Sequence, residues 1–142
     1  MKVVSGGMYL AGLGPGVFGE AGGPWDGALA DARHMRALMV LTEHWSDELF
    51  PRGVAVHAMH PGWADTIVWL AAAPEAALTS GGLWLDRERH PAAVLPGTAG
   101  SPGERRRLVE ELERITGGPS ASPRVTRAKR RTVDPGVRTS IR

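Results

Sequence analysis

The residues of this chain that could act as nucleophile, base or acid are few and lie far apart in the sequence. Ser5, His60 and Asp65 together supply the residue types of a hydrolase triad. A nucleophilic serine of the α/β-hydrolase kind lies in a G-x-S-x-G turn, and Ser5 is not part of such a pattern. These residues therefore do not predict a serine hydrolase.

Histidines are the main candidate metal ligands, and two of them, His57 and His60, lie three positions apart. In an extended strand this spacing directs side chains to opposite faces, so the two imidazoles do not converge on one ion. The chain has no cysteine, which excludes disulfides, cysteine-bound zinc and thiol catalysis within it. We expect no metal site, and the absence of cysteine is compatible with the cytoplasm as the expected location.

A glycine-rich stretch, GPGVFG at 14–19, matches the G-x-G-x-x-G pattern of dinucleotide-binding loops. Such a loop needs a strand before its first glycine and a helix that begins at its last, so that the helix N-terminus meets the pyrophosphate. Residues 20–24, EAGGP, cannot open a helix. We interpret 14–19 as a glycine-rich surface loop and not as a cofactor loop.

The distribution of charge divides the chain into two parts. The whole chain has 142 residues, of which 42% are hydrophobic and 23% charged, as is typical of one globular domain. Residues 118–142 contain seven Lys or Arg and one acid, with hardly any large apolar side chain. We expect a domain over 1–117 and a basic, disordered tail over 118–142. The tail lacks interleaved aromatic residues, so nucleic-acid binding is not expected, and no apolar run is long enough to cross a membrane.

The pattern of apolar residues and breakers predicts alternating strands and helices. The expected elements are, in order, a strand end at 3–4, a loop over 8–25, a helix over 28–49, a strand over 53–59, a helix over 67–73, a strand over 83–85 and a helix opened by a capping box at 101–104. In the long helix, Leu38, Leu41 and Trp45 are expected on one apolar face. The alternation favours an α/β fold with part of a doubly wound parallel sheet.

Several segments, in one order, resemble the short-chain dehydrogenase/reductase family. HAMHPGWADT at 57–66 is similar to the segment after the sixth strand, where a P-G-x-x-x-T pattern lines the nicotinamide end of the cofactor. VSGGMY at 4–9, LTEHW at 41–45 and GGLWLDR at 81–87 resemble further family segments, and the branch is the one with SGGMY and MHPGWADT motifs. The resemblance covers about 3–117 and implies the C-terminal half of a Rossmann-like sheet.

The resemblance also implies roles for individual residues. Ser5 lies at the position of the serine that polarises the substrate, and Pro61, Gly62 and Thr66 lie at positions that contact NAD or NADP. The family further needs a Tyr and a Lys four residues apart on the long helix, where the ammonium lowers the pKa of the phenol so that it can exchange a proton. These two positions are occupied by Asp31 and Met35.

Other parts of the family pattern are also missing. The only tyrosine is Tyr9 and the only lysines are Lys2 and Lys129, so no shift of the alignment restores the couple. A glycine-rich cofactor loop and a substrate-covering segment are not found either. These absences predict a truncated and catalytically impaired protein of an NAD(P)-dependent oxidoreductase lineage. Without the covering segment, the sequence does not identify a substrate. The alternative is a non-catalytic module that associates through helix 28–49 and contacts anions through the basic tail.

Overall fold

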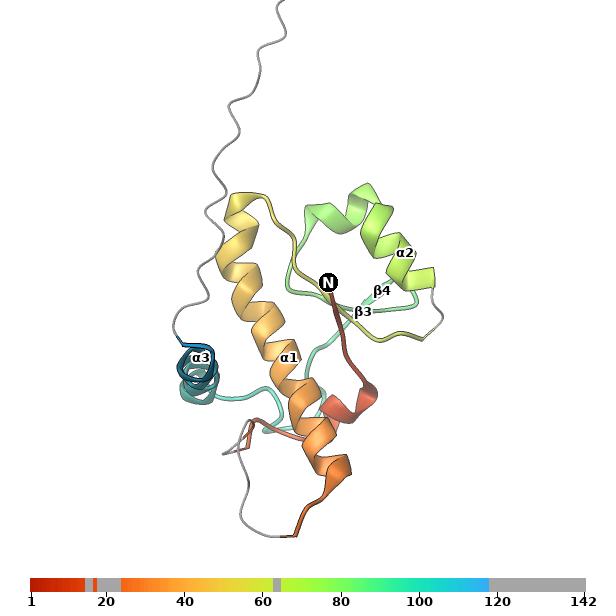
Figure 1. Cartoon of the computed structure of the whole chain (residues 1–142). Helices are drawn as coiled ribbons and strands as arrows, with labels where there is room; N and C mark the ends of the chain where they lie inside the picture. Colours follow the sequence, from red (N-terminus) through yellow and green to blue (C-terminus); the bar gives the residue numbers. More distant parts are fainter. Residues whose placement is uncertain (15–16, 18–23, 63–64, 118–142) are drawn as a thin grey trace, which may run out of the picture.

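The computed structural model describes residues 1–14, 17, 24–62 and 65–117 of the chain (Figure 1). The predictions for the glycine-rich loop at 14–19 and for the basic tail at 118–142 fall largely or wholly outside the described residues. Within the described part, no helix is long and apolar enough to cross a membrane.

A small, mostly parallel sheet forms the centre of the domain. Its strands are β1 (Lys2–Val3), β2 (Ala58–Met59), β3 (Leu83–Leu85) and β4 (Glu88–His90), in the order β1-β2-β3-β4. The first three are parallel, with Val3 opposite Met59 and Met59 opposite Trp84, whereas β4 runs antiparallel to β3. The predicted α/β class with an open, largely parallel sheet is confirmed.

The last strand, β4, was not expected from the sequence. A two-residue turn joins it to β3, and both turn residues, Asp86 and Arg87, have positive φ angles of 49° and 64°. Tight hairpin turns of this kind favour Asn-Gly or Asp-Gly, because glycine enters this region without strain. Asp-Arg carries no such signal, so the hairpin could not be read from the local sequence.

The long helix α1 (Gly27–Leu49) agrees with the predicted helix to within one residue. Asp26 caps it, since its carboxylate accepts hydrogen bonds from the backbone N–H groups of Ala28 and Leu29. The helix passes into a short 3₁₀ turn, η2 (Phe50–Arg52), which Gly53 ends with a φ angle of 81°. The chain-breaking residues Pro51 and Gly53 thus lie directly after α1, where the helix ends.

Helix α1 is packed on two sides, which corrects the expectation of a single apolar face. Leu38 packs with the sheet, next to a cluster formed by Val4, Met8, Met39, Ala58 and Leu83. Leu41 and Trp45 instead pack toward the last helix, in a cluster with Leu13, Ala37, Val40 and Leu108. A helix that lies between two layers buries apolar residues over more than one stripe, so the spacing of Leu38 and Leu41 did not define one face.

The remaining helices cover the other surfaces. Helix α2 (Asp65–Ala72), followed by the 3₁₀ helix η3 (Pro74–Leu78), lies across the sheet from α1 (Figure 1). Helix α3 (Pro102–Thr116) begins with the predicted capping box, ends at Gly117 and lies on the outer side of α1. Its Leu108 is buried, whereas Ile115 is 52% exposed.

Candidate functional site

A small pocket lies where the parallel strands end, which is the usual place for a ligand in an open α/β sheet. Its walls come from the end of β1, the short 3₁₀ helix η1 (Gly6–Tyr9), the end of β2 and the β3–β4 hairpin. The lining residues are Val4, Ser5, Gly6, Met8, Tyr9, His60, Leu83, Leu85 and His90. The volume is about 40 Å³, whereas sites for small-molecule ligands usually have about 300–1,000 Å³.

Ser5 and Asp31 lie at the same corner of this pocket region. A methyl group placed on Gly7 would lie 3.3 Å from Ser5 Oγ and 3.6 Å from Asp31 Oδ2. The 3₁₀ helix η1, whose last two residues were predicted as part of a loop, lies between the end of β1 and the start of α1. The position predicted for the substrate-polarising serine is thus close to the position at which the family places its tyrosine.

Met35, predicted to occupy the position of the family lysine, lies one turn after Asp31 on α1. Its side chain is half-buried and packs against the sheet-side cluster that includes Met8 and Met39. A thioether carries no charge, so it can neither lower the pKa of a neighbouring phenol nor hydrogen-bond a ribose hydroxyl as a donor. The side chain of Met35 therefore contributes apolar packing and no charge at this point of α1.

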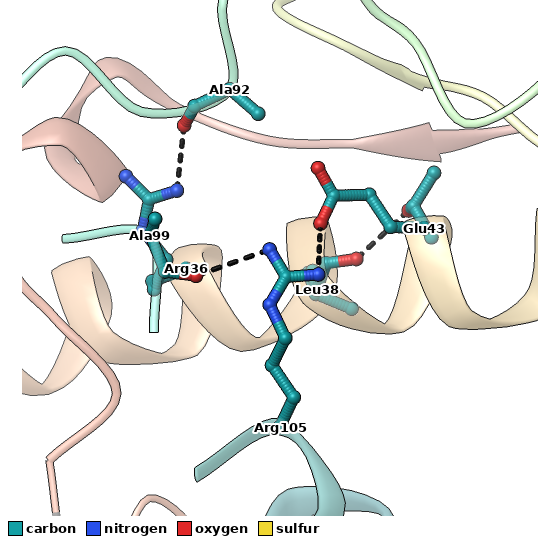
Figure 2. A network of polar contacts seen from close by, with 7 residues as sticks. Arg36, Leu38, Glu43, Ala92, Ala99 and Arg105 are labelled. Atoms are coloured by element: carbon teal, nitrogen blue, oxygen red, sulfur yellow. Dashed lines mark hydrogen bonds and ion pairs between the residues drawn. The ribbon is translucent and has the colours of Figure 1, made fainter. Parts of the chain in front are cut away.

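The neighbouring Arg36 is a buried cation, and each of its three guanidinium nitrogens donates a hydrogen bond within the chain. Its guanidinium donates to three backbone carbonyls: Met8 O from Nη2 at 2.6 Å, Ala11 O from Nε at 3.3 Å and Ala92 O from Nη1 at 2.6 Å. Figure 2 shows the bond to Ala92. Burial lowers the pKa of Arg36, and the nearby Glu43 carboxylate partly opposes this. Arg36 therefore joins η1 to the segment after β4 and does not replace the missing lysine.

A second arginine in Figure 2 connects α3 to the same region. Arg105 Nη1 lies 2.5 Å from Glu43 Oε2 on α1, and its Nη2 donates to Ala99 O at 3.1 Å. Both side chains of the ion pair are partly screened from solvent. This pair holds α3 against α1 and lies on the side of α1 that faces away from the sheet.

Tyr9, the only tyrosine, lines the pocket but does not supply the missing acid. Its hydroxyl donates a hydrogen bond to Pro91 O at 2.9 Å. Burial raises the pKa of Tyr9 above its ordinary value, and the charge of Arg36 lowers it by less. The family chemistry needs a phenol whose pKa is lowered, so the environment of Tyr9 has the opposite effect.

The turn after β2 uses its own polar groups. Gly62 donates its backbone N–H to His60 Nδ1 at 3.2 Å, and Gly62 has a φ angle of 32°. Thr66 is buried, and its hydroxyl accepts the backbone N–H of Arg87 at 3.2 Å. The adjacent Asp65 forms an ion pair with Arg87 at 2.5 Å. Thr66 and Asp65 thus hold the start of α2 to the β3–β4 turn.

These contacts test whether the described residues fit a nicotinamide cofactor. The Thr66 hydroxyl and the Gly62 N–H are bonded within the chain, Pro61 is exposed, and the adjacent pocket is small. Together with the uncharged side chain of Met35 beside the pocket region, these contacts do not make a fit for NAD or NADP among the described residues. The cofactor roles of Pro61, Gly62 and Thr66, and the role of Ser5, remain predictions.

The two histidines near β2 lie in different environments. His57 is buried, its Nδ1 accepts a hydrogen bond from Trp84 Nε1–H at 3.0 Å, and its Nε2 lies 2.9 Å from Ala76 O. His60 instead lines the pocket on the side of α1. Over residues 1–14, 17, 24–62 and 65–117, no group of three or more His, Cys, Asp or Glu side chains is arranged to hold a metal ion.

Two residues of the site were missed by sequence reasoning. His60 was weighed only as a metal ligand or triad member, and His90 only as one of the scattered histidines that do not form a metal site, although both line the pocket. His90 could be placed only with the β3–β4 hairpin in view, since it lies opposite Leu83 in that pairing. Position directly after a buried strand is the one local signal that could have marked His60.

The sheet, the helices on its two sides and a pocket at the strand ends define a Rossmann-like α/β domain. The chain is 33% identical to dehydrogenase/reductase SDR family member 12 of Bos taurus and 28% identical to the Homo sapiens protein of the same name. Each alignment covers 81% of this chain and 45% of the relative, so the chain spans less than half the length of the curated relatives it matches. No family model and no solved structure matches. This distant homology supports a place among the short-chain dehydrogenases/reductases and an oxidoreductase lineage.

Proposed function

We propose that this chain is a short-chain dehydrogenase/reductase-type domain of an NAD(P)-dependent lineage that does not catalyse hydride transfer by itself. The observation that carries the proposal is which residues stand at two positions of α1, Asp31 and Met35. Asp31 lies near Ser5 at the corner where the family has its tyrosine, and Met35 is packed against the apolar cluster where the family has its lysine.

The chemistry of these two side chains supports an inactive centre. A carboxylate in its ionised form only accepts hydrogen bonds, and no lysine lies near Asp31 in the sequence to form the proton-exchanging couple of the family. No other described residue supplies the couple, since Tyr9 is bonded to Pro91 and Arg36 to backbone carbonyls. Ser5 keeps its predicted place for polarising an oxygen, but without a proton-exchanging partner.

Titration and turnover of the purified chain test the proposal. We expect no oxidation or reduction of NADH, NADPH, NAD or NADP above background with a panel of alcohols, aldehydes and ketones. Isothermal titration with NADH and NADPH measures cofactor binding separately from chemistry. Turnover that co-purifies with this chain through two orthogonal columns would overturn the proposal.

A double substitution tests whether the Tyr–Lys couple is the only part of the family's catalytic machinery that this chain lacks. We expect D31Y/M35K to stay at background, because the described residues do not fit the cofactor that the couple would serve. The single variant D31Y, which leaves the apolar packing of Met35 intact, is the matched control. Turnover in the double variant and not in D31Y would show that a working cofactor site is present.

Association through helix 28–49 and anion binding by the tail remain the alternative prediction. The described part of the chain covers α1 on two sides, by the sheet and by α3, so its large apolar residues are mostly used internally. Salt-sensitive binding to polyanions with no heat on adding NADH or NADPH would favour this alternative.

A further inference from the structure

The buried side chain of His57 joins the sheet to the layer that α2 and η3 form on one of its faces. Its Nδ1 meets the indole N–H of Trp84 on β3, and its Nε2 lies 2.9 Å from the carbonyl of Ala76 in η3. Ala76 is itself buried, and Trp84 packs against Trp69 of α2 with ring centroids 5.1 Å apart. The imidazole of His57 therefore lies at the junction between the α2–η3 layer and the sheet.

The two contacts of this ring require His57 to be neutral. An indole N–H only donates, so the 3.0 Å bond from Trp84 Nε1 makes Nδ1 of His57 an acceptor. The neutral ring then carries its hydrogen on Nε2, which donates to the Ala76 carbonyl. An imidazolium carries hydrogens on both nitrogens, so in protonated His57 two N–H groups would face each other. One added proton thus removes the bond to Trp84 and places a charge in a buried position.

The cations on the neighbouring strands oppose a positive charge on His57. Arg89 on β4 is the partner of Trp84 in the β3–β4 pairing. A methyl group placed on Gly82 would lie 2.9 Å from Trp84 Nε1 and 3.1 Å from Arg89 Nε, so the guanidinium lies beside the same indole N–H. On β1, the ammonium of Lys2 is directed to the other face of the sheet, over the ring of a tryptophan of α1. The nearest fixed charge is therefore a cation, which repels a second one.

The acids of the α2–η3 layer do not compensate for a positive ring. Its two carboxylates are Asp65, which forms an ion pair with Arg87, and Glu75, whose side chain is exposed. The ring nitrogens have other partners, so neither carboxylate bonds to the imidazole. The other histidines of the strand region, His60 and His90, line the pocket on the α1 side of the sheet.

We propose that His57 is a pH-sensitive contact whose protonation separates the α2–η3 layer from the sheet while the α1 side stays packed. The closed form holds a neutral ring and the opened form takes up one proton, so acid favours opening. The closed form is therefore fully favoured above the ordinary titration range of histidine, near about pH 6.5, and loses stability as the pH falls below it. On the α1 side, Arg36 stays charged throughout this range, so its bonds do not change. The proposal goes beyond the proposed function because it needs neither cofactor nor substrate.

Nuclear magnetic resonance of the whole chain at about pH 7.5 and about pH 5 tests the proposal. At the higher pH, long-range proton–nitrogen spectra should show the hydrogen of His57 on Nε2. At the lower pH, the Trp84 indole hydrogen and the amides of α2 and η3 should exchange with solvent faster, after correction for intrinsic rates. Uptake of one proton permits a change of up to about tenfold per pH unit, so we expect about tenfold or more over this interval. The amides around buried Met39 on α1 should keep their protection.

Substitutions separate the effect of His57 from the general effects of acid. H57Q carries an amide that does not titrate, so exchange from α2 and η3 should no longer depend on pH beyond its intrinsic rate. W84F removes the N–H that faces Nδ1, so its response to acid should be at most about half that of the parent chain, and it serves if H57Q does not fold. H34A, on the exposed surface of α1, is the control and should respond as the parent does.

Four results would overturn the proposal. They are a hydrogen on Nδ1 of His57 at the higher pH, an equal loss of protection on both sides of the sheet, and an unchanged acid response in H57Q or in W84F. None of them depends on whether the chain binds NADH or turns over a substrate, so this proposal and the proposed function fail independently.

Discussion

The two faces of the central sheet use polar residues in different ways. On the side of α2, polar groups are bonded to one another: His57 accepts from Trp84, and Thr66 accepts from Arg87. On the side of α1, each guanidinium nitrogen of Arg36 donates to a backbone carbonyl, but Ser5 and His60 at the strand ends keep free hydrogen-bonding groups. A buried polar group usually has a partner, because leaving it unpaired costs free energy. Groups left free beside a pocket are therefore the better candidates for ligand binding.

The largest effect is expected at Arg36, which joins the two segments that wall the pocket. R36M removes the donors from the carbonyls of Met8, Ala11 and Ala92. Each buried carbonyl left without a donor costs about 1–3 kcal/mol, so we expect a loss of at least about 3 kcal/mol in the free energy of unfolding. Urea unfolding, followed by circular dichroism, measures it.

The matched control for Arg36 is R106M, because Arg106 is exposed on α3 and should contribute less than about 0.5 kcal/mol. R36K is a milder variant that keeps the charge and loses part of the donor set. If R36M does not fold, R36K should still unfold at a lower urea concentration than R106M. Equal stability of R36K, R36M and R106M would contradict the role given to Arg36.

A smaller effect is expected on the opposite face, at Trp84. W84F removes the Nε1–H that donates to His57 Nδ1 and reduces the ring contact with Trp69, whose centroid lies 5.1 Å away. We expect a loss of about 1–3 kcal/mol, since an acceptor in a buried histidine is left without its donor. W25F is the control, because Trp25 is 84% exposed. A W84F variant as stable as W25F would show that the His57 bond contributes nothing.

The same comparison shows which features the sequence could reveal. The ends of the helices were predicted well because their signals are local: Asp26 caps α1, and Ser101 and Glu104 form the capping box of α3. The alternation of strands and helices likewise predicted the parallel sheet. Each of these signals lies within a few residues of the feature it predicts.

The features that were missed depend on contacts between distant segments. Arg36 lies in an ordinary helical pattern, and its burial follows from carbonyls of the η1 region and of the segment after β4. Charged residues are seldom buried, so composition argues against the observed position. His90 entered the pocket through a hairpin without a glycine turn signal. The pocket is therefore a product of the fold and not of any one motif.

The smallest effect concerns Thr66, where the family resemblance and the structure suggest different roles. T66V keeps the shape but removes the hydroxyl that accepts the Arg87 N–H. We expect a loss of about 0.5–1.5 kcal/mol in the free energy of unfolding, the usual contribution of one hydrogen bond. T79V is the control, because the hydroxyl of Thr79 is buried without a hydrogen-bond partner in the described structure, and its removal should be neutral or stabilising.

Thr66 also allows the cofactor prediction to be separated from the packing role. If Thr66 only holds the β3–β4 turn to α2, T66V lowers stability while any measured affinity for NADH or NADPH stays the same. If the hydroxyl contacts the nicotinamide end, titration of T66V should show weaker cofactor binding at temperatures where the variant is fully folded. A loss of cofactor affinity in T66V without a loss of stability would support the cofactor contact that the family resemblance implies for Thr66. The polar groups on the α2 side of the sheet would then include a ligand-binding residue as well as structural ones.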